Sequence, residues 1–398
     1  MYAAALVFAL AGAPDPPPAP LRLADALALA RTSNPTLAAA RLRAPVDAGG
    51  VAVAHERPNP DLHYERAKET PRDSLAVSQL LEMGGKRGRR IAVAEATALT
   101  GQAELAQAEA EALADVRRAF FVLSGSARRL EAARELRDLA ARARTAAADR
   151  FEVGDVSRLD VLQADLVLAQ AENEAAALEG EEGAARVELN VLIGRDLAAP
   201  TTTADEIDVA AVPVGPEATA AALAANSALA VMDRQVAEAE ARAALARAQR
   251  VPDPTLEATL THGAEPEFTW GWRAAVGVTI PVFTRHSAQV AVEEATAALL
   301  RAQRDALAQR IRGAAGAAAA RAAAQAEQYR RYRDLILPRS REVETMAEEA
   351  YRSGQTNLTT FLQALQAARE LRAKALQSAA DYETALADLQ RALTTGPR

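Results

Sequence analysis

The stretch RFEVGDVSRLDVLQA, residues 150–164, is matched by AYRSGQTNLTTFLQA, residues 350–364. Each has an aromatic residue, a glycine three positions after it and a closing Leu-Gln-Ala, and each lies within a long alanine-rich segment. Glycine supplies the backbone freedom that a sharp return between two helices needs. The sequence therefore predicts two helical hairpins, with turns at residues 151–158 and 351–358.

Other motifs recur in the same order, which indicates an internal duplication. PNPDL (58–62) corresponds to PDPTL (252–256), and LAVSQLLEMGGKR (75–87) corresponds to VGVTIPVFTRH (276–286). Each half therefore has the predicted order helix, strand hairpin, long helix, turn and long helix.

The predicted domain organisation has three parts. Residues 1–13 are expected to be a signal peptide, because the apolar run AAALVFALAGA is too short to span a bilayer and ends in small residues. Residues 14–200 form the first repeat and residues 201–398 the second.

The distribution of proline shows where long helices are allowed. No proline occurs between Pro71 and Pro200, and only Pro338 interrupts the segment between Pro281 and Pro397. A helix over residues 86–151 would contain about 66 residues and extend about 100 Å. In the first repeat, Pro45 and the pair Gly49-Gly50 predict a break or kink in the first helix.

One face of the helix after the first turn carries residues that recur every three or four positions, which predicts a helix-packing face. These residues are Leu159, Leu162, Leu166, Ala169, Asn173, Ala176, Gly180, Gly183 and Val187. A soluble helical bundle explains this periodicity equally well.

The segment FTWGWRAAVGVTI, residues 268–280, changes to a period of two, which predicts a strand with one apolar face. Four strands are predicted, at about residues 61–67, 73–81, 255–263 and 268–281. Their length of roughly ten residues is what a tilted transmembrane β-strand needs. Tyr64, Phe268, Trp270 and Trp272 are the predicted aromatic belt at the membrane interface. A small sheet packed on a helical bundle is the alternative.

Composition excludes several classes of function. The formal net charge of −7 argues against a nucleic-acid partner. The chain has no cysteine, so disulfides, thiolate metal sites and an N-terminal lipid anchor on cysteine are not expected. The four histidines are scattered without the spacing of a zinc site, so no catalytic residue, metal site or cofactor is predicted.

The order of elements, repeated twice, resembles the outer-membrane factor family of TolC-like efflux channels. SQLLEMGGKRGRRIAVAE (78–95) is similar to the strand-to-helix junction of the heavy-metal cation-efflux branch, and RFEVGDVSRLDVL is similar to the family's periplasmic hairpin turn. The resemblance covers about residues 21–394.

The resemblance implies a mainly α fold with a small transmembrane β part. In it, three protomers each give four strands to a 12-stranded outer-membrane β-barrel, and long helical hairpins form an α-barrel in the periplasm. The implied function is the passive outer-membrane channel of a tripartite RND-type efflux system, which is not an enzyme. The implied partners are two further copies, a periplasmic adaptor, an inner-membrane RND pump and outer-membrane lipid, with heavy-metal cations as substrate.

The family's functional positions carry over residue by residue. The adaptor-docking turns are expected at Val153, Gly154, Asp155, Ser157, Ser353, Gly354 and Asn357. An entrance gate is expected at Arg158, Asp160, Thr360 and Gln363, where Thr360 and Gln363 replace two aspartates that relatives carry.

The basic segment KRGRR, residues 86–90, is expected to form a strand-to-helix turn whose cationic side chains face lipid phosphates or water. Two other interpretations of the whole chain stay open. A periplasmic adaptor would also contain a helical hairpin, and a soluble coiled-coil scaffold would also contain long helices.

Overall fold

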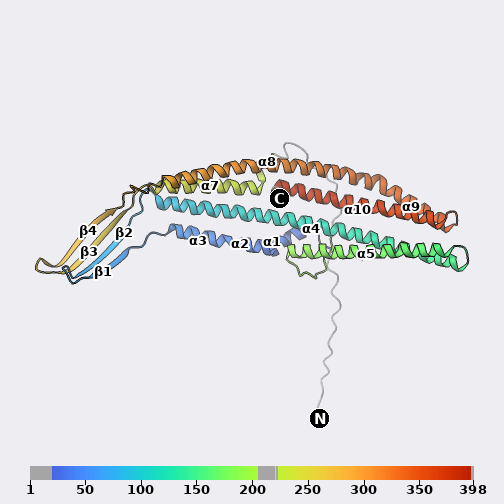
Figure 1. The fold of residues 1–398 in the computed structure, drawn as a ribbon, viewed down its shortest axis with the longest axis horizontal. Coiled ribbons are helices and arrows are strands. Elements are labelled where there is room, and N and C mark those ends of the chain that lie inside the picture. Colours follow the sequence, from blue (N-terminus) through green and yellow to red (C-terminus); the bar gives the residue numbers. More distant parts are fainter. Residues whose placement is uncertain (1–19, 205–219, 221–222, 396–398) are drawn as a thin grey trace, which may run out of the picture. The chain divides into compact units, whose positions relative to one another are not determined.

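The computed structural model describes residues 20–204, 220 and 223–395, so the predicted signal peptide lies outside the described residues (Figure 1). The chain divides into two compact units that interleave along the sequence. Unit 1 comprises Met1–Asn34, Asp115–Ala211 and Ala322–Ala387, and unit 2 comprises Pro35–Ala114, Val212–Arg321 and Asp388–Arg398.

Unit 2 contains one antiparallel sheet with the strand order β1-β2-β3-β4. The strands are β1 (Asp61–Arg66), β2 (Asp73–Leu80), β3 (Pro254–Ala264) and β4 (Phe268–Val278). Pairing of β2 with β3, from Asp73↔His262 to Leu80↔Thr255, joins the two hairpins across the duplication. β4 ends three residues before the expected boundary at residue 281, because its last partner, Pro254, begins β3.

The register gives the sheet two chemically different faces. Leu62, Val77, Ala258 and Ala274 form one cross-strand row, and the adjacent row on the opposite face contains His63, Ala76, Thr259 and Arg273. Side chains of successive residues point to opposite faces of a strand, so the apolar and polar rows alternate over the sheet. The alternation predicted for residues 268–280 is therefore confirmed over the length of β4.

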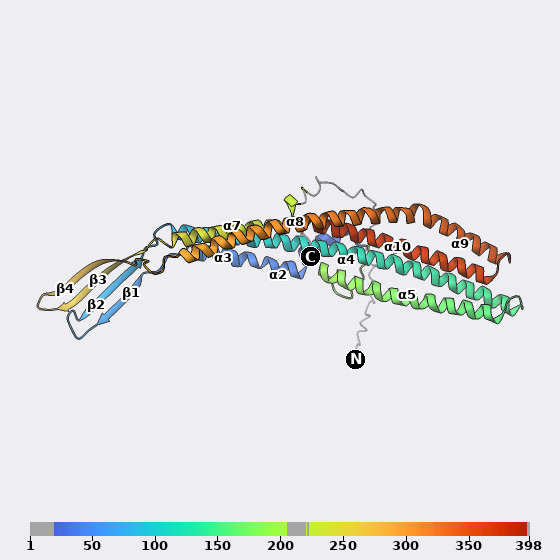
Figure 2. The same cartoon turned by 45° about the horizontal axis from the view of Figure 1, so that its top comes forward.

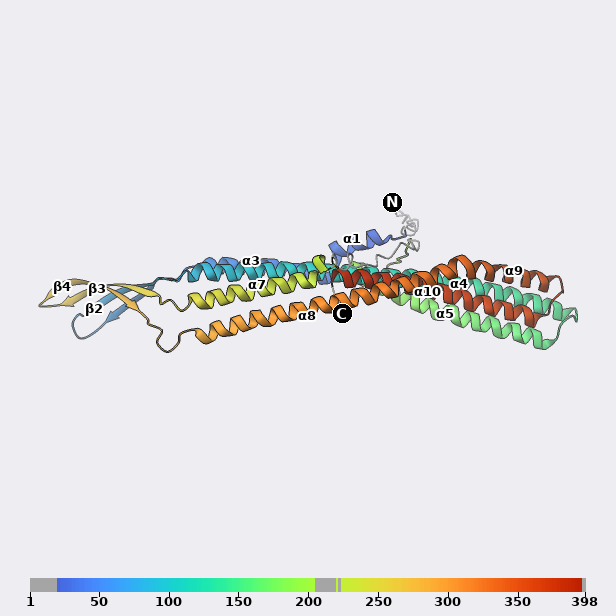
Figure 3. The ribbon, with the colours of Figure 1, turned by 90° about the horizontal axis from the view of Figure 1, so that it is seen from above.

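Each helix of unit 2 next to the sheet continues one strand. α3 (Arg43–His55) precedes β1, α4 (Lys86–Glu152) follows β2, α7 (Ser227–Ala248) precedes β3, and α8 (Ser287–Arg331) follows β4. α3 contacts α4 through Arg43 Nη1 and Glu104 Oε2, which lie 4.0 Å apart. The Thr100 hydroxyl of α4 donates to Glu238 Oε2 of α7 at 2.9 Å, and Arg304 Nε of α8 lies 2.9 Å from Asp233 Oδ1 of α7. In unit 2 the helices therefore lie in the order α3-α4-α7-α8, the order of the strands that they continue (Figures 1 and 3).

The break predicted in the first helix is present. α2 (Pro35–Arg41) ends before Leu42, and α3 restarts at Arg43. Pro45 falls in the first turn of α3, where its missing N–H would have had no helical partner. Gly49 and Gly50, in contrast, are ordinary helical residues inside α3.

Unit 1 is built from α1 (Leu23–Ser33), α5 (Arg158–Ile193), α9 (Leu337–Arg352), most of α10 (Leu358–Thr394) and parts of α4 and α8 (Figure 2). A π-helical turn, η1 (Tyr332–Ile336), joins α8 to α9. Pro338 cannot donate a hydrogen bond to Asp334, and Leu337 donates to the Tyr332 carbonyl instead, so the turn widens.

The face of α5 predicted to pack is exposed within a single chain. Leu159, Leu162 and Leu166 are 63%, 54% and 60% exposed. The buried face is the opposite one and consists of Ala164, Ala171, Ala175, Ala185, Leu189, Asn190 and Ile193. Alanine lets neighbouring helices approach closely, so the smaller face packs inside the protomer and the leucine face is left outside.

Candidate functional site

Each predicted glycine turn ends a long helix in the same way. Gly154 has φ +79° and Gly354 has φ +75°, the left-handed region that glycine adopts without strain. The Asp155 N–H donates to the Arg150 carbonyl, and the Gln355 N–H donates to the Ala350 carbonyl, both at 2.9 Å. These bonds complete Schellman motifs, so the two turns predicted from the repeated glycine are confirmed.

The helices after the turns begin with side-chain caps. The Asp160 N–H donates to Ser157 Oγ at 3.3 Å, and the Ser157 N–H donates to Asp160 Oδ2 at 2.9 Å, which is a capping box. Hydrogen bonds from the Ser157 hydroxyl and backbone lower the pKa of Asp160. In the second turn, the Thr360 N–H donates to Asn357 Oδ1 at 2.9 Å. Ser157, Asp160, Asn357 and Thr360 therefore have a local structural role in starting the helices.

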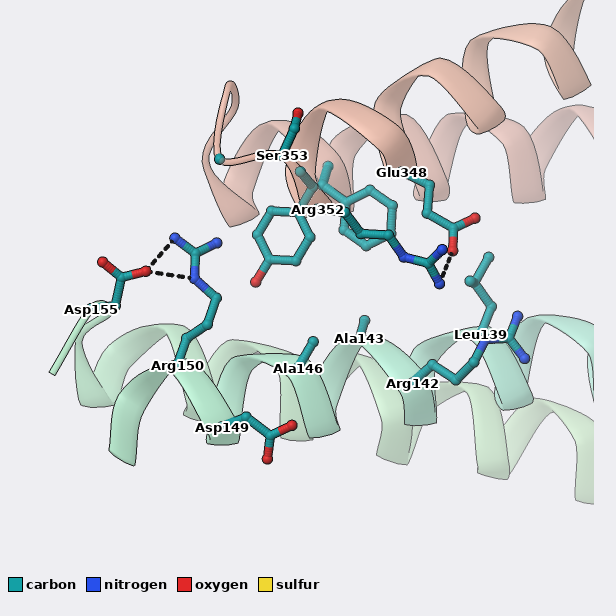
Figure 4. Close-up of a pocket in the computed structure, with 13 residues that line it drawn as sticks. Leu139, Arg142, Ala143, Ala146, Asp149, Arg150, Asp155, Glu348, Arg352 and Ser353 are labelled. Atoms are coloured by element: carbon teal, nitrogen blue, oxygen red, sulfur yellow. Dashed lines mark hydrogen bonds and ion pairs between the residues drawn. The ribbon is translucent and has the colours of Figure 1, made fainter. Parts of the chain in front are cut away.

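Between the two hairpins of unit 1 lies an open cleft of about 520 Å³, which we call the tip cleft (Figure 4). Its lining residues come from α4, α9, α10 and both turns. They are Leu139, Arg142, Ala143, Ala146, Asp149, Arg150, Asp155, Glu348, Tyr351, Arg352, Ser353, Gly354 and Phe361.

The charges of the tip cleft are arranged in pairs. Arg150 Nη2 lies 2.9 Å from Asp155 Oδ2 on the first hairpin, and Arg352 Nη2 lies 2.9 Å from Glu348 Oε1 on the second (Figure 4). The hydrogen bond that Arg150 donates to Asp155 raises the pKa of Arg150. The cleft therefore has positively and negatively charged side chains around its apolar floor.

Tyr351 forms that floor together with Phe361. Their rings stack with centroids 5.1 Å apart and an interplanar angle of 3°, and the Arg150 guanidinium lies 5.3 Å from the Tyr351 centroid. Tyr351 is 4% exposed, and its hydroxyl, beside Arg150, makes no hydrogen bond of regular geometry among the described residues. A buried hydroxyl without a partner is unfavourable, by about 1–3 kcal/mol, so a group that formed a hydrogen bond with it would stabilise this site.

The structure brings only some of the predicted turn residues into the tip cleft. Asp155, Ser353 and Gly354 line it. Val153, Ser157, Asn357, Arg158, Thr360 and Gln363 are exposed and lie outside its lining, and Asp160 and Gly154 are also outside it. Sequence reasoning missed Arg150, Tyr351 and Phe361, although the aromatic residue three positions before each glycine was a visible signal.

The predicted aromatic belt lies on the apolar face of the sheet. Tyr64, Trp272 and Trp270 are exposed, and Phe268 pairs with Ala264 at the turn end of β4. The Trp270 ring lies 4.5 Å from the His262 ring, and the Tyr64 hydroxyl donates to Asp73 at 2.8 Å. The aromatic side chains thus gather near the hairpin turns, next to polar partners.

Three of the four cationic side chains after β2 do not face outward as expected, whereas Arg89 is exposed. Lys86 Nζ lies 2.6 Å from Asp253 Oδ2, and Arg87 donates to the His55 carbonyl at 2.7 Å. Arg90 donates to the Ala54 carbonyl at 3.2 Å and the Glu56 carbonyl at 2.8 Å. The C-terminal carbonyls of α3 have no helical partners and carry negative partial charge, so the guanidinium groups bind there.

Lys86 and Asp253 join the two repeats at the base of the sheet. Burial opposes ionisation of Asp253, but hydrogen bonds from Lys86 and from the Met83 N–H outweigh it and lower the pKa of Asp253. This ion pair therefore holds the two repeats together within unit 2. The sequence had instead predicted that the cationic side chains of this segment face lipid phosphates or water.

The two junction glycines should differ in their tolerance of alanine. Gly84 and Gly85 both have positive φ, of 67° and 71°, but a Cβ on Gly84 would lie 2.8 Å from the Val251 side chain, whereas one on Gly85 meets nothing within 4 Å. We expect G85A to lower the free energy of unfolding by about 1–2 kcal/mol through backbone strain. G84A should lower the free energy of unfolding by about 1–3 kcal/mol more than G85A, because of the clash with Val251. Chemical unfolding of both variants measures the difference. Equal losses would show that Val251 moves aside freely.

No helix within the described ranges is both long and apolar enough to cross a bilayer. Over the same ranges, no three His, Asp or Glu side chains come together as a metal site.

Comparison with known proteins identifies the fold and the family. Residues 26–195 match the family model described as outer membrane efflux protein. The chain is 31% identical over 301 residues to the cobalt-zinc-cadmium resistance protein CzcC of Cupriavidus metallidurans, which covers 73% of this chain and 70% of that protein.

Solved structures share the fold at lower identity. The crystal structure of CusC matches with a TM-score of 0.78 at 16% identity, covering 94% of this chain and 92% of that one. VceC of Vibrio cholerae matches with a TM-score of 0.74 at 15% identity, covering 94% and 96%. The chain therefore belongs to the outer membrane efflux protein family, and it is a transport protein, an efflux channel, and not an enzyme.

Proposed function

We propose that three copies of this chain form the outer-membrane channel of a tripartite efflux system, which passively conducts heavy-metal cations delivered by an inner-membrane RND pump and a periplasmic adaptor. The observation that carries the proposal is the four-stranded sheet of unit 2, with one apolar face, one polar face and two open edges.

The open edges support a closed assembly. The outer edges of β1 and β4 have no strand partner among the described residues. Unpaired edges invite pairing with another chain, and backbone groups in a bilayer must be hydrogen-bonded. If β1 of one copy pairs with β4 of the next, three copies supply twelve strands and leave no edge.

The two faces support a position in the outer membrane. The face with Leu62, Ala274 and the tryptophans would contact lipid, with the aromatic belt at the interface. The opposite face presents Glu257 and Arg273, which lie 3.9 Å apart, to the water-filled lumen. The helical part would then lie in the periplasm, and no nucleic-acid partner is involved.

Metal cations are proposed as the substrate because the relative from Cupriavidus metallidurans is named for cobalt, zinc and cadmium resistance. A conduit has to let ions leave as easily as they enter. The polar face of the sheet fits this requirement, because its acidic residues are spread out: Asp61 and Glu257 share a cross-strand row but are separated by Ser78, and Glu65 lies in another row.

Deletion of the gene tests the function and the substrate together. We expect increased sensitivity to Zn²⁺, Co²⁺ and Cd²⁺, restored by the wild-type chain, with drug sensitivity unchanged. Sensitivity to drugs but not to metals would reject the metal substrate and keep the channel. No change in any sensitivity, with the protein recovered as a soluble monomer without detergent, would reject the channel.

For the adaptor, the tip cleft is the proposed docking site, together with Val153, Gly154, Asp155, Ser157, Ser353, Gly354 and Asn357. The unpartnered Tyr351 hydroxyl supports it, since a donor in an otherwise apolar floor fits an acceptor on the adaptor. The entrance gate at Arg158, Asp160, Thr360 and Gln363 is proposed as a separate function of the same end of the helices.

Replacing Tyr351 by phenylalanine separates docking from folding. Y351F keeps the ring stack with Phe361 and removes only the unpaired hydroxyl, so the free energy of unfolding should stay equal or rise slightly. Affinity for the adaptor should fall about five- to tenfold, measured by titration of the two purified proteins. Y329F, a half-buried tyrosine outside the cleft lining, is the control and should bind like wild type. Unchanged affinity of Y351F would remove the hydroxyl from the docking site.

A further inference from the structure

The four places where a strand of unit 2 is joined to a helix carry an excess of positive charge (Figure 1). They are residues 56–60, 81–90, 249–253 and 279–286. Together they contain seven lysine and arginine residues and three acidic residues, in a chain whose formal net charge is −7. The hairpin turns at the other end of the sheet, residues 67–72 and 265–267, contain two cationic and three acidic residues. Positive charge is therefore concentrated at the helix end of the sheet.

Four of these cationic side chains are exposed, one at each place, and we call them the junction arginines. They are Arg57, Arg89, Arg250 and Arg285. Each lies within four residues of the helix end that is next to the sheet. The side chains of the first three make no ion pair or hydrogen bond with any described residue, and Arg285 donates only to the Val282 carbonyl, at 3.3 Å.

The nearby acidic side chains are mostly engaged elsewhere. Asp253 is paired with Lys86, and Glu82 is paired with Arg90. Glu56 is the only other acidic residue at these four places, and it is exposed. The junction arginines therefore form a cationic surface that the described part of the chain does not neutralise.

Large apolar side chains are exposed at the same places. Phe283 is 99% exposed, and Ile280, which continues the apolar alternation of β4, is 73% exposed. Met83 and Val251 are also exposed. A surface that combines exposed apolar groups with cationic side chains is typical of the membrane–water interface, where the apolar groups enter the acyl region and the cations stay near the headgroups.

The chemistry of the four cations favours a phosphate ligand. A guanidinium group can donate two parallel N–H bonds to a phosphate, and it is more weakly hydrated than an ammonium group. An anionic headgroup such as phosphatidylglycerol carries that phosphate without a charge of its own that would repel arginine. Each cation close to an anionic membrane surface favours binding by an amount that corresponds to about a fivefold change in affinity.

We infer that the junction arginines bind the phosphate groups of anionic phospholipids in the periplasmic leaflet, with Phe283 placed among the acyl chains. The inference rests on the proposed position of the sheet in the outer membrane. It assigns lipid binding to these four residues, whereas Lys86, Arg87 and Arg90 bind within the chain.

Lipid titration of the full chain in neutral detergent tests the inference. Phosphatidylglycerol and phosphatidylcholine with the same fluorescent label are the probes. We expect wild type to bind phosphatidylglycerol about tenfold more tightly, with a preference that falls as salt is added. In R57Q/R89Q/R250Q/R285Q the two lipids should bind equally. The matched control, R234Q/R310Q/R312Q/R321Q, removes four exposed arginines from α7 and α8 and should keep the preference.

The outcomes separate the lipid site from the channel. A trimer in which the quadruple junction variant keeps the preference, or in which wild type has none, overturns the inference and keeps the proposed channel. Displacement of phosphatidylglycerol by millimolar inorganic phosphate would show a site for free anions and also overturns it. A chain recovered as a soluble monomer without detergent overturns both.

Substitution of Phe283 separates the apolar contribution from the ionic one. F283S removes the exposed ring, so it should weaken binding of both lipids by the same factor and leave the preference for phosphatidylglycerol unchanged. F283W keeps a large apolar ring and should bind both lipids like wild type. Wild-type binding of both lipids by F283S would contradict the placement of Phe283 among the acyl chains.

Discussion

Replacing Ala274 by arginine should prevent assembly of the channel, whereas the same change at Ala275 should be tolerated. The two residues are neighbours on β4 but face opposite sides of the sheet, since Ala274 pairs with Ala258 and Ala275 with Glu257. On a lipid-facing surface near the bilayer centre, an arginine destabilises the folded barrel by about 2–4 kcal/mol. On the polar face an arginine at position 275 has the Glu257 carboxylate opposite it.

The measurement is the yield of trimer in outer-membrane fractions and its urea midpoint after reconstitution in lipid. A274R should lose most of the trimer, and A275R should retain wild-type yield. If both variants assemble equally well, the face with Ala274 is not the one in contact with lipid.

Removing Arg128 should cost unit 1 about 3–5 kcal/mol of unfolding free energy, because it leaves a carboxylate buried without its counter-charge. Arg128 Nη1 on α4 lies 3.2 Å from Glu383 Oε1 on α10, and the Glu383 side chain is 4% exposed. R128M keeps much of the apolar volume and removes only the charge. The double variant R128M/E383L should recover most of the loss, since an apolar pair of similar volume replaces a buried ion pair at little cost.

The same pair gives a pH dependence with a definite sign. Burial raises the pKa of Glu383, although Arg128 counteracts it. A carboxyl whose pKa is higher in the folded state contributes stability that is complete below its unfolded value and is lost as the pH rises through the folded value. R128M should therefore gain stability on acidification more steeply than wild type, and R128M/E383L should not, in thermal unfolding followed by circular dichroism. A pH-independent deficit in R128M would show that lost packing, and not the charge, is responsible.

Local patterns predicted most of the elements. The absence of proline after Pro71 predicted one helix from Lys86, and α4 runs to Glu152. Strict alternation predicted β4, and the repeated glycine predicted both turns. These features depend on residues close together in the chain, which is why periodicity and backbone preference were sufficient.

Features that depend on distant partners were not predictable in the same way. The pairing of β2 with β3 joins residues nearly two hundred positions apart, and nothing in either strand alone specifies it. The stripe on α5 was visible, but its spacing does not say whether the partner is in the same chain, and Leu159 is in fact exposed. Arg87 and Arg90 looked like surface charges because the free carbonyls at the end of α3 cannot be seen in a sequence.

The connectivity α3-β1-β2-α4 is repeated as α7-β3-β4-α8, so each chain carries two modules of the same construction. A closed ring of three chains then has six modules, and it departs from sixfold symmetry only where the halves differ in sequence. The turns are one such place, with Val153-Gly154 in one half and Ser353-Gly354 in the other. A protein that recognises these turns therefore meets six nearly equivalent positions of two alternating kinds, and its own stoichiometry depends on whether it distinguishes valine from serine.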